Sequence, residues 1–373
     1  MFRNLLALAC LVAITAGVRG ADDDSWVGGK VILTAPGVRI GHMGEDGFPV
    51  YVAELTDSAY VVLQEQGGWL CVRQRGVMGW FPKAQAVPVE DAVAYFSERI
   101  RFNGPDALAY AHRGRAWQER DRLDEALKDY DEALRLFPMQ PSWLRGRGGV
   151  YEEKREFERA VRDYSESIRL NPRDASTFLD RGIAYKSMKS FDQAAADYSE
   201  AIRLDPKWAP PYYNRANLWR DRKEYDKAIA DYTSAIRLDP EDPDAYFNRA
   251  NIYRSRREYA KAVADYRDVI RLDPKEPDAY DSLAWILATC PDDKVRDGQK
   301  AVDYAGTACE LTDASSAYFV STLAASFAEI GKFEQAVKWQ KRALESPRYE
   351  KEEGEKARQR LDLYEAHRPY RDQ

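Results

Sequence analysis

Residues 203–240 read RLDPKWAPPYYNRANLWRDRKEYDKAIADYTSAIRLDP, and the four-residue phrase that opens and closes this stretch recurs every 34 residues in nearly the same form, as RLFP, RLNP or RLDP. A fixed period of this length is typical of stacked repeats, in which each unit buries its apolar face only against its neighbours. The sequence therefore predicts a long binding surface rather than a catalytic pocket. The prolines that end the recurring phrase are Pro138, Pro172, Pro206, Pro240 and Pro274.

Each unit contains two helical patterns, which we call helix A and helix B. When every unit is numbered from 1 to 34, position 8 of helix A is glycine or alanine, and position 20 of helix B is alanine in the first five units. Small residues at these positions let the two backbones approach, and large residues at positions 4, 11 and 24 fill the space beside them. The proline at position 32 ends helix B, because proline cannot continue the hydrogen-bond ladder. The units begin at Ala107, Pro141, Ala175, Ala209, Pro243 and Pro277, and a seventh begins near Ala317, after five extra residues between the helices of the sixth.

This spacing of large, small and proline positions resembles the tetratricopeptide repeat family over residues 107–346. The resemblance implies a mainly α chain, an α-solenoid of about seven helix hairpins. A solenoid also needs a polar end cap. Residues 347–373 fit a C-terminal capping helix, because Ala357, Leu361 and Tyr364 fall on one face of it.

An arginine at position 7 and an aspartate at position 23 recur together in the first five units. Both positions adjoin core positions, so we expect an ion pair between helices A and B rather than a row of anion-binding arginines. The seventh unit lacks both partners and has Leu323 and Trp339 instead. In the sixth unit Leu283 stands opposite Asp303, an exception that the sequence does not explain. The arginines are Arg113, Arg147, Arg181, Arg215 and Arg249, and the aspartates are Asp129, Asp163, Asp197, Asp231 and Asp265.

Residues 21–88 have a different pattern, in which glycines separate short β-rich runs. Several short strands in succession predict a small all-β barrel. The segments Gly67-Gly68-Trp69 and Gly79-Trp80-Phe81 resemble bacterial SH3-like domains. That resemblance implies binding of peptides or cell-wall polymer, with Trp69 and Trp80 either in the core or in a groove. The expected strands are residues 30–33, 38–42, 50–55, 60–64, 69–73 and 79–81.

Residues 89–106 are predicted to form a lone capping helix, half of a repeat. Residues 92–103 align without gaps to residues 160–171 and share the 34-residue register. No Gly/Ser-rich or Pro-rich linker separates this helix from the predicted barrel. We therefore expect a stiff junction between the barrel and the solenoid.

Residues 1–20 are typical of a cleaved signal peptide, because Arg3 precedes a short apolar run and small residues precede Ala21. An uncleaved anchor is the alternative. The chain is thus expected to be exported (periplasmic, cell-envelope or secreted) and not membrane-spanning after cleavage. The net charge of −6, which loss of Arg3 and Arg19 makes two units more negative, argues against nucleic acid as a partner. The remaining cysteines, Cys71, Cys290 and Cys309, are expected to be buried free thiols.

Positions 2, 6, 9 and 13 of helix A lie away from its core-facing positions. In the tetratricopeptide repeat family this stripe lines a concave surface, so the resemblance implies a peptide-binding groove. Asparagine side chains there could donate to and accept from an extended peptide backbone. Alternatively, they solvate the helix or bridge neighbouring repeats. The candidate peptide-binding residues are Tyr213, Asn214, Asn217 and Arg220 in the fourth unit, Phe247, Asn248, Asn251 and Arg254 in the fifth, and Trp285 in the sixth.

No catalytic residue, cofactor or metal ion is expected. His42, His112 and His367 belong to separate parts of the chain, and no nucleophile or phosphate-loop motif occurs. The clamp with which some family members capture a C-terminal carboxylate is not predicted either, because its cationic positions hold Tyr213, Asp278 and Ser282.

The sequence thus predicts an exported protein-interaction scaffold that binds a peptide or protein segment in the groove of the repeats. The alternative is a cell-envelope attachment protein, whose SH3-like barrel binds wall polymer while the solenoid acts as a spacer.

Overall fold

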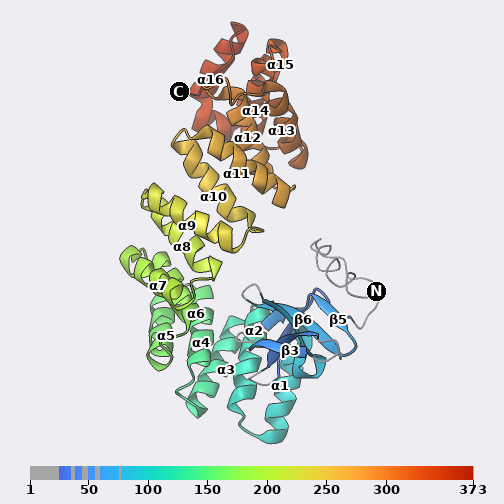
Figure 1. Ribbon diagram of the computed structural model, residues 1–373, viewed down its shortest axis with the longest axis vertical. Coiled ribbons are helices and arrows are strands. Elements are labelled where there is room, and N and C mark those ends of the chain that lie inside the picture. Colours follow the sequence, from blue (N-terminus) through green and yellow to red (C-terminus); the bar gives the residue numbers. More distant parts are fainter. Residues whose placement is uncertain (1–24, 35–37, 44–48, 55–58, 75–76, 373) are drawn as a thin grey trace. The chain divides into compact units, whose positions relative to one another are not determined.

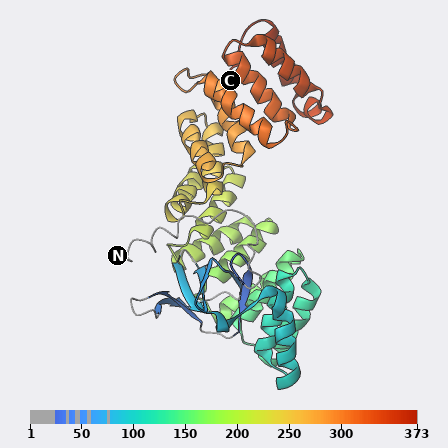
Figure 2. The ribbon, with the colours of Figure 1, turned by 90° about the vertical axis from the view of Figure 1, so that its right-hand side faces the viewer.

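The computed structural model describes residues 25–34, 38–43, 49–54, 59–74 and 77–372 (Figures 1 and 2). The predicted signal peptide, residues 1–20, lies outside the described residues. The chain divides into two compact units, Met1–Ser190 and Phe191–Gln373, which we describe in turn. None of the helices in the described ranges combines the length and the apolar character that crossing a membrane requires.

The first unit opens with short antiparallel strands in two sheets. One sheet has the order β4-β1-β8 and the other the order β3-β2-β7-β6-β5. The described strands form no closed barrel, so only a small all-β region is confirmed here. The predicted turn at Gly67-Gly68 joins β5 to β6, and both glycines have positive φ (56° and 83°). The strands are β1 (Lys30–Leu33), β2 (Arg39–Met43), β3 (Pro49–Glu54), β4 (Ala59–Val61), β5 (Gln64–Gln66), β6 (Trp69–Gln74), β7 (Val77–Pro82) and β8 (Ala86–Pro88).

Side chains from both sheets meet in one apolar cluster. Gly79 on β7 lies against Ile40, and a Cβ atom there would come within 2.8 Å of the Ile40 Cβ, so only glycine allows this approach. Trp69 and Trp80 stay half-buried and lie outside this cluster. The cluster comprises Val31, Leu33, Val38, Ile40, Tyr60, Val62, Leu70, Val72, Phe81 and Ala86.

The predicted capping helix is confirmed as α1 (Val89–Asn103), and Gly104, with φ 76°, follows its last residue. Ile32 of β1 and Phe96 of α1 belong to the same buried cluster as Ala109 of the next helix. Lys30 of β1 also pairs with Glu119 at 2.6 Å. The β region and the first helices therefore share a core, and this region cannot be cut off without exposing apolar surface.

The rest of the first unit consists of helix hairpins. A proline or a side-chain cap starts several of the helices; the Asp106 carboxylate, for example, accepts from the backbone N–H of Ala109 at 3.1 Å. Each predicted helix A start in this unit is confirmed. The helices are α2 (Ala107–Glu119), α3 (Leu123–Leu136), α4 (Pro141–Glu153), α5 (Phe157–Leu170) and α6 (Ala175–Ser187).

The second unit continues the hairpins and ends in the predicted capping helix, α16. Ala357 and Tyr364 are fully buried, while Leu361 is half-buried. The predicted helix A starts are confirmed here too, including Ala317. The helices are α7 (Phe191–Leu204), α8 (Ala209–Asp221), α9 (Tyr225–Leu238), α10 (Pro243–Ser255), α11 (Tyr259–Leu272), α12 (Pro277–Thr289), α13 (Gly298–Leu311), α14 (Ala317–Glu329), α15 (Phe333–Leu344) and α16 (Pro347–Glu365).

The small and large positions pack as predicted. Ala216 and Ala228 are fully buried where α8 meets α9, and Tyr232 fills the space beside them. In the second repeat, Gly148 lies against Tyr164, and an added Cβ would come within 2.6 Å of that ring. The tyrosines at position 24 are therefore core residues.

The predicted ion pairs between helices A and B are bidentate. Arg249 Nε and Nη2 each donate to the Asp265 carboxylate at 2.8 Å. The same arginine donates through Nη1 to Thr233 of the preceding repeat at 2.8 Å, a contact between repeats that the sequence reasoning did not include. The same bidentate pairing joins Arg113 to Asp129, Arg147 to Asp163 and Arg215 to Asp231.

The apparent exception in the sixth repeat comes from a one-residue misalignment. Since α13 begins at Gly298, Tyr304 and not Asp303 stands at position 23. Asp303 is exposed and accepts from Gln299 at 3.1 Å. The alignment of Leu283 with Asp303 was wrong, and both members of the ion pair are absent from this repeat.

Candidate functional site

The nine candidate peptide-binding residues lie on three successive helix A segments, α8, α10 and α12, all in the second unit. We call this set the helix A stripe. Asn217 is buried and the other eight side chains are half-buried. The stripe is therefore a packed surface with defined side-chain positions rather than a fully solvated face.

Asn248 connects two repeats. Its Oδ1 accepts from Arg220 Nη1 at 2.6 Å, and its Nδ2 donates to the Tyr213 hydroxyl at 3.2 Å. Both partners lie on α8, whereas Asn248 lies on α10. This contact agrees with the alternative that an asparagine bridges neighbouring repeats.

Asn217 and Asn251 each bind a tyrosine of helix B in their own repeat. The Tyr232 hydroxyl donates to Asn217 Oδ1 at 2.5 Å, and the Tyr266 hydroxyl donates to Asn251 Oδ1 at 2.7 Å. Burial raises the pKa of both phenols, so they stay protonated and act as donors. These two amide oxygens satisfy core hydroxyl groups.

The aromatic residues of the stripe pack on the same tyrosines. The ring centroids of Tyr213 and Tyr232 are 6.0 Å apart, and those of Phe247 and Tyr266 are 5.8 Å apart, both in edge-on geometry. Aromatic pairs at these distances stabilise a packing arrangement beyond simple burial. Asn214 is tied only to its own helix, because its Nδ2 donates to the Pro210 carbonyl at 3.0 Å.

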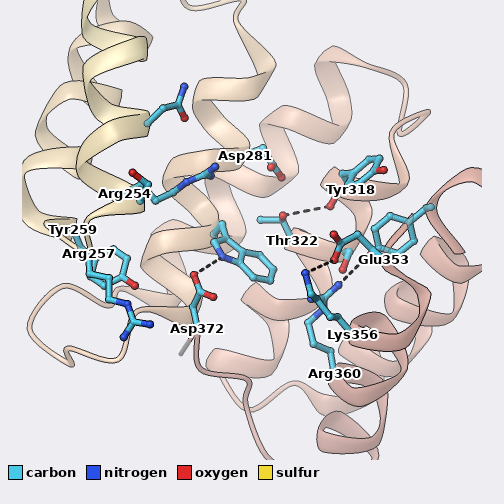
Figure 3. A pocket seen from close by; sticks show the side chains of 15 residues that line it. Arg254, Arg257, Tyr259, Asp281, Tyr318, Thr322, Glu353, Lys356, Arg360 and Asp372 are labelled. Atoms are coloured by element: carbon cyan, nitrogen blue, oxygen red, sulfur yellow. Dashed lines mark hydrogen bonds and ion pairs between the residues drawn. The ribbon is translucent and has the colours of Figure 1, made fainter. Parts of the chain in front are cut away.

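The stripe ends in a pocket of about 640 Å³ in the second unit (Figure 3). Asn251, Arg254 and Trp285 belong to both the stripe and the pocket. Other parts of the wall come from α14, α16 and the segment after α16, none of which was predicted to adjoin the stripe. Among these wall residues are Tyr318, Ser321, Thr322, Lys356, Arg360 and Asp372.

Asp281 is the acidic residue of α12 in this pocket. The Oδ1 atom of Asp281 is shielded from solvent and has no hydrogen-bond partner among the described residues. Burial raises its pKa to about 6, against smaller opposing effects from Thr322 and Arg254. An aspartate within the apolar sequence of α12 was the available sequence signal for this site.

Two of the histidines, His112 and His367, pack against aromatic rings. The ring of His112 on α2 stacks on Phe96 at 5.3 Å, and burial lowers its pKa to about 4. The ring of His367 stacks on Phe333 at 5.1 Å. Within the described ranges, no group of three or more His, Cys, Asp and Glu residues is placed to hold a metal ion. Cys71, Cys290 and Cys309 are buried free thiols, as predicted.

Family models agree with the repeat assignment. Models described as tetratricopeptide repeat match residues 89–141, 113–175, 145–209 and 243–276, and one described as TPR repeat matches residues 216–254. The first match begins at the first residue of α1, as expected for half of a repeat. The matched residues, 89–209 and 216–276, therefore carry tetratricopeptide repeats. Proteins of this class are generally interaction scaffolds, and the matching models indicate no catalytic family.

One solved structure with a TM-score above 0.5 supports this fold, and two others are similar at lower scores. The C-terminal part of a TPR repeat-containing protein from Cytophaga hutchinsonii is 17% identical, with a TM-score of 0.52, over 63% of this chain and 94% of that chain. The pilF protein of Pseudomonas aeruginosa is 18% identical, with a TM-score of 0.49, over 57% of this chain and 94% of that one. YrrB, described as a TPR protein with an unusual peptide-binding site, is 21% identical, with a TM-score of 0.42, over 50% of this chain and 96% of that one. No curated protein matches the chain significantly.

Proposed function

We propose that this chain is an exported interaction scaffold that binds a peptide or protein segment along the helix A stripe. The observation that carries the proposal is the continuity of the stripe. Amide, aromatic and guanidinium groups on α8, α10 and α12 are held by hydrogen bonds and ring contacts, and the row ends in an open pocket. Side chains fixed before binding lose less conformational entropy when a ligand arrives.

The structure also decides which residues should be changed in a test. Replacing Asn217 or Asn251 would leave a buried tyrosine hydroxyl without its acceptor, so a loss of binding could reflect a damaged core. Asn214 and Asn248 are the better choices, because their partners are half-buried or lie on the same helix.

The test is a capture experiment with an envelope extract and the Asn214→Ala/Asn248→Ala double variant. A matched control carries Glu241→Ala and Lys275→Ala, two exposed residues in the turns that follow α9 and α11. We expect the wild type and the control to retain the same proteins, identified by mass spectrometry, and the double variant to lose them. Equal capture by all three proteins, each with an unchanged circular dichroism spectrum, would refute binding through the stripe.

The second candidate is attachment to the cell envelope through an SH3-like barrel formed by residues 21–88. The half-buried positions of Trp69 on β6 and Trp80 on β7 favour it, because such rings can still contact a ligand. Since the β region shares a core with α1 and α2, an isolated fragment is not a sound probe. Co-sedimentation of the full chain with purified cell wall, compared with Trp69→Ala and Trp80→Ala variants, distinguishes the two functions.

Export is proposed from the sequence alone. Expression of the full chain with a C-terminal tag, followed by N-terminal sequencing of the tagged product, tests it. A product that begins at Ala21 supports cleavage, whereas a product that begins at Met1 and fractionates with membranes supports an anchor.

A further inference from the structure

The pocket at the end of the helix A stripe is bounded by helices that are distant in sequence. Arg254 comes from α10, Asp281 and Trp285 from α12, Tyr318 from α14, and Arg360 from α16 (Figure 3). Aromatic rings and hydroxyl groups provide half of the remaining wall, and charged or amide groups, including Arg257 and Lys356, provide the other half. Its volume of about 640 Å³ is within the range of small-ligand sites.

The pocket contains positive charge that the described residues do not neutralise. Arg254 and Arg360 form no ion pair with any described carboxylate, although the arginines at position 7 are paired in most repeats. Arg360 is only 5% exposed, and its buried Nε has no hydrogen-bond partner in the part of the chain that the structure describes. A buried guanidinium with an unused donor is costly unless an acceptor reaches it. In a chain with a net charge of −6, these groups indicate an anionic ligand.

The acidic residues of the wall do not reverse this preference. The Glu353 carboxylate lies 3.5 Å from Lys356 Nζ, so these two charges neutralise each other. Burial raises the pKa of Asp281 to about 6, so its carboxyl group becomes neutral below that pH and is ionised above it. The protonated form of its carboxyl group could also donate to a bound carboxylate.

The chain itself shows what kind of group this pocket accepts. Beyond α16, the Asp372 carboxylate accepts from Trp285 Nε1 at 3.3 Å, and the Asp372 backbone N–H donates to the Thr289 carbonyl at 2.9 Å. Tyr370 lies against the rings and guanidinium of the same wall, 5.9 Å from Trp285 and 5.7 Å from Arg360. Asp372 thus lines the pocket, and Tyr370, two positions earlier, packs against Trp285 and Arg360 of its wall.

We propose that the pocket binds a peptide segment with an aromatic residue followed two positions later by an acidic one, and that residues 370–372 occupy part of it as an internal ligand. Binding of an external segment requires displacement of these residues. The inference rests on the proposed function, because Arg254 and Trp285 also belong to the helix A stripe.

The test uses a fluorescent peptide with the sequence of residues 366–373, AHRPYRDQ, and a C-terminal amide, so that only the aspartate supplies a carboxylate. The peptide is titrated into the full chain and into a chain that ends at Glu365, and binding is followed by fluorescence anisotropy. A tethered ligand acts at an effective concentration in the millimolar range, so it should weaken binding of a free peptide of about 100 μM affinity by about tenfold. We therefore expect the shortened chain to bind about tenfold more tightly than the full chain.

Two further variants show whether the chemistry is as inferred. A peptide with alanine in place of Asp372, and a shortened chain with Trp285→Phe, each lose the hydrogen bond between the aspartate carboxylate and the indole N–H, so each should reduce binding by about tenfold. If the shortened chain does not fold, the full chain with Tyr370→Ala and Asp372→Asn takes its place. Equal affinity of the full and tail-free proteins, absence of binding to a folded tail-free protein, or indifference to the aspartate would each overturn the inference.

The outcome is separate from that of the proposed function. The capture experiment changes Asn214 and Asn248, which do not line the pocket. A failure of the tail peptide together with stripe-dependent capture would reject the internal ligand alone. Tail-peptide binding together with unchanged capture would reject the stripe and leave the pocket as the binding site.

Discussion

The ion pair between Arg249 and Asp265 allows the most quantitative prediction. Replacing Asp265 with alanine removes two hydrogen bonds of 2.8 Å from a guanidinium whose side chain is only 14% exposed. Breaking a buried ion pair by removing one partner costs about 3–5 kcal/mol, because the other charge stays buried without compensation. Arg249 keeps its bond to Thr233, so we expect the lower end of that range, about 3 kcal/mol.

The matched control is Asp268→Ala on the same helix. Asp268 pairs with Arg271 at 3.1 Å, but the two side chains are 41% and 58% exposed, and such surface pairs contribute less than about 1 kcal/mol. The same type of substitution, three residues away on α11, therefore isolates the effect of burial.

The assay is urea unfolding followed by circular dichroism, together with hydrogen exchange of the α10 and α11 amides. Exchange is needed because repeat arrays often unfold in segments rather than in a single step. We expect exchange of these two helices to accelerate strongly in Asp265→Ala and to change little in Asp268→Ala. Similar behaviour of the two variants would refute the claim that these buried pairs hold helices A and B together.

Three further predictions concern packing and protonation. Gly146→Ala should destabilise the chain by about 1–3 kcal/mol, because the new Cβ would lie 2.6 Å from the buried Tyr130 hydroxyl. Gly306→Ala, with open space around the new Cβ, should stabilise it by about 0.5–1 kcal/mol. Thermal unfolding of both variants tests this, and the opposite order of stability would contradict it. The pKa of His112 is lowered to about 4 in the folded state, so the unfolded chain binds more protons between pH 4 and 6.5, and the free energy of unfolding should rise with pH in that window. In urea titrations from pH 4.5 to 7.5, His112→Phe should remove this part of the dependence of stability on pH. An unchanged dependence would contradict the burial argument. The pKa of Asp281 is raised to about 6 in the folded state, so its contribution to the free energy of unfolding falls as pH rises from about 4 to 6. Asp281→Asn should therefore stabilise the chain at pH 7.5 by on the order of 1–2 kcal/mol but not at pH 4. A loss of stability at pH 7.5 would show that the ionised carboxylate has a partner in the fold.

The repeat architecture could be predicted from the sequence because its determinants are local and recur at one spacing. The starts at Ala107 and Pro243, the small residue Ala216 opposite Ala228, and the pairing of Arg249 with Asp265 all follow from positions counted within one unit. One residue of error in counting through the insertion of the sixth repeat was enough to misplace Asp303, although the N-cap residue Asp297 marks where α13 begins.

A backbone feature of the repeats was missed although it is periodic. Position 15, in the turn between helices A and B, has positive φ in each of the first five units, and glycine takes this position only in the seventh unit, at Gly331. The five residues are Asp121, Arg155, Lys189, Lys223 and Arg257. The sequence gives little warning, because charged residues are not typical of the left-handed region. The packed helices on either side compensate the cost of that conformation.

The amino-acid sequence by itself determined the repeat, its register, its core and the ion pairs within each hairpin, because each of these depends on contacts between residues less than one repeat apart. Only the tertiary structure decided which contacts the residues of the stripe make and which residues line the pocket at its end. Asn217 and Asn251 accept from buried tyrosines, Asn248 bridges two repeats, and the pocket is lined by helices as distant in sequence as α10 and α16, with Asp372 beside Trp285, 87 residues earlier in the chain. Such a contact has no periodic signal, since it depends on where the last helix directs the end of the chain.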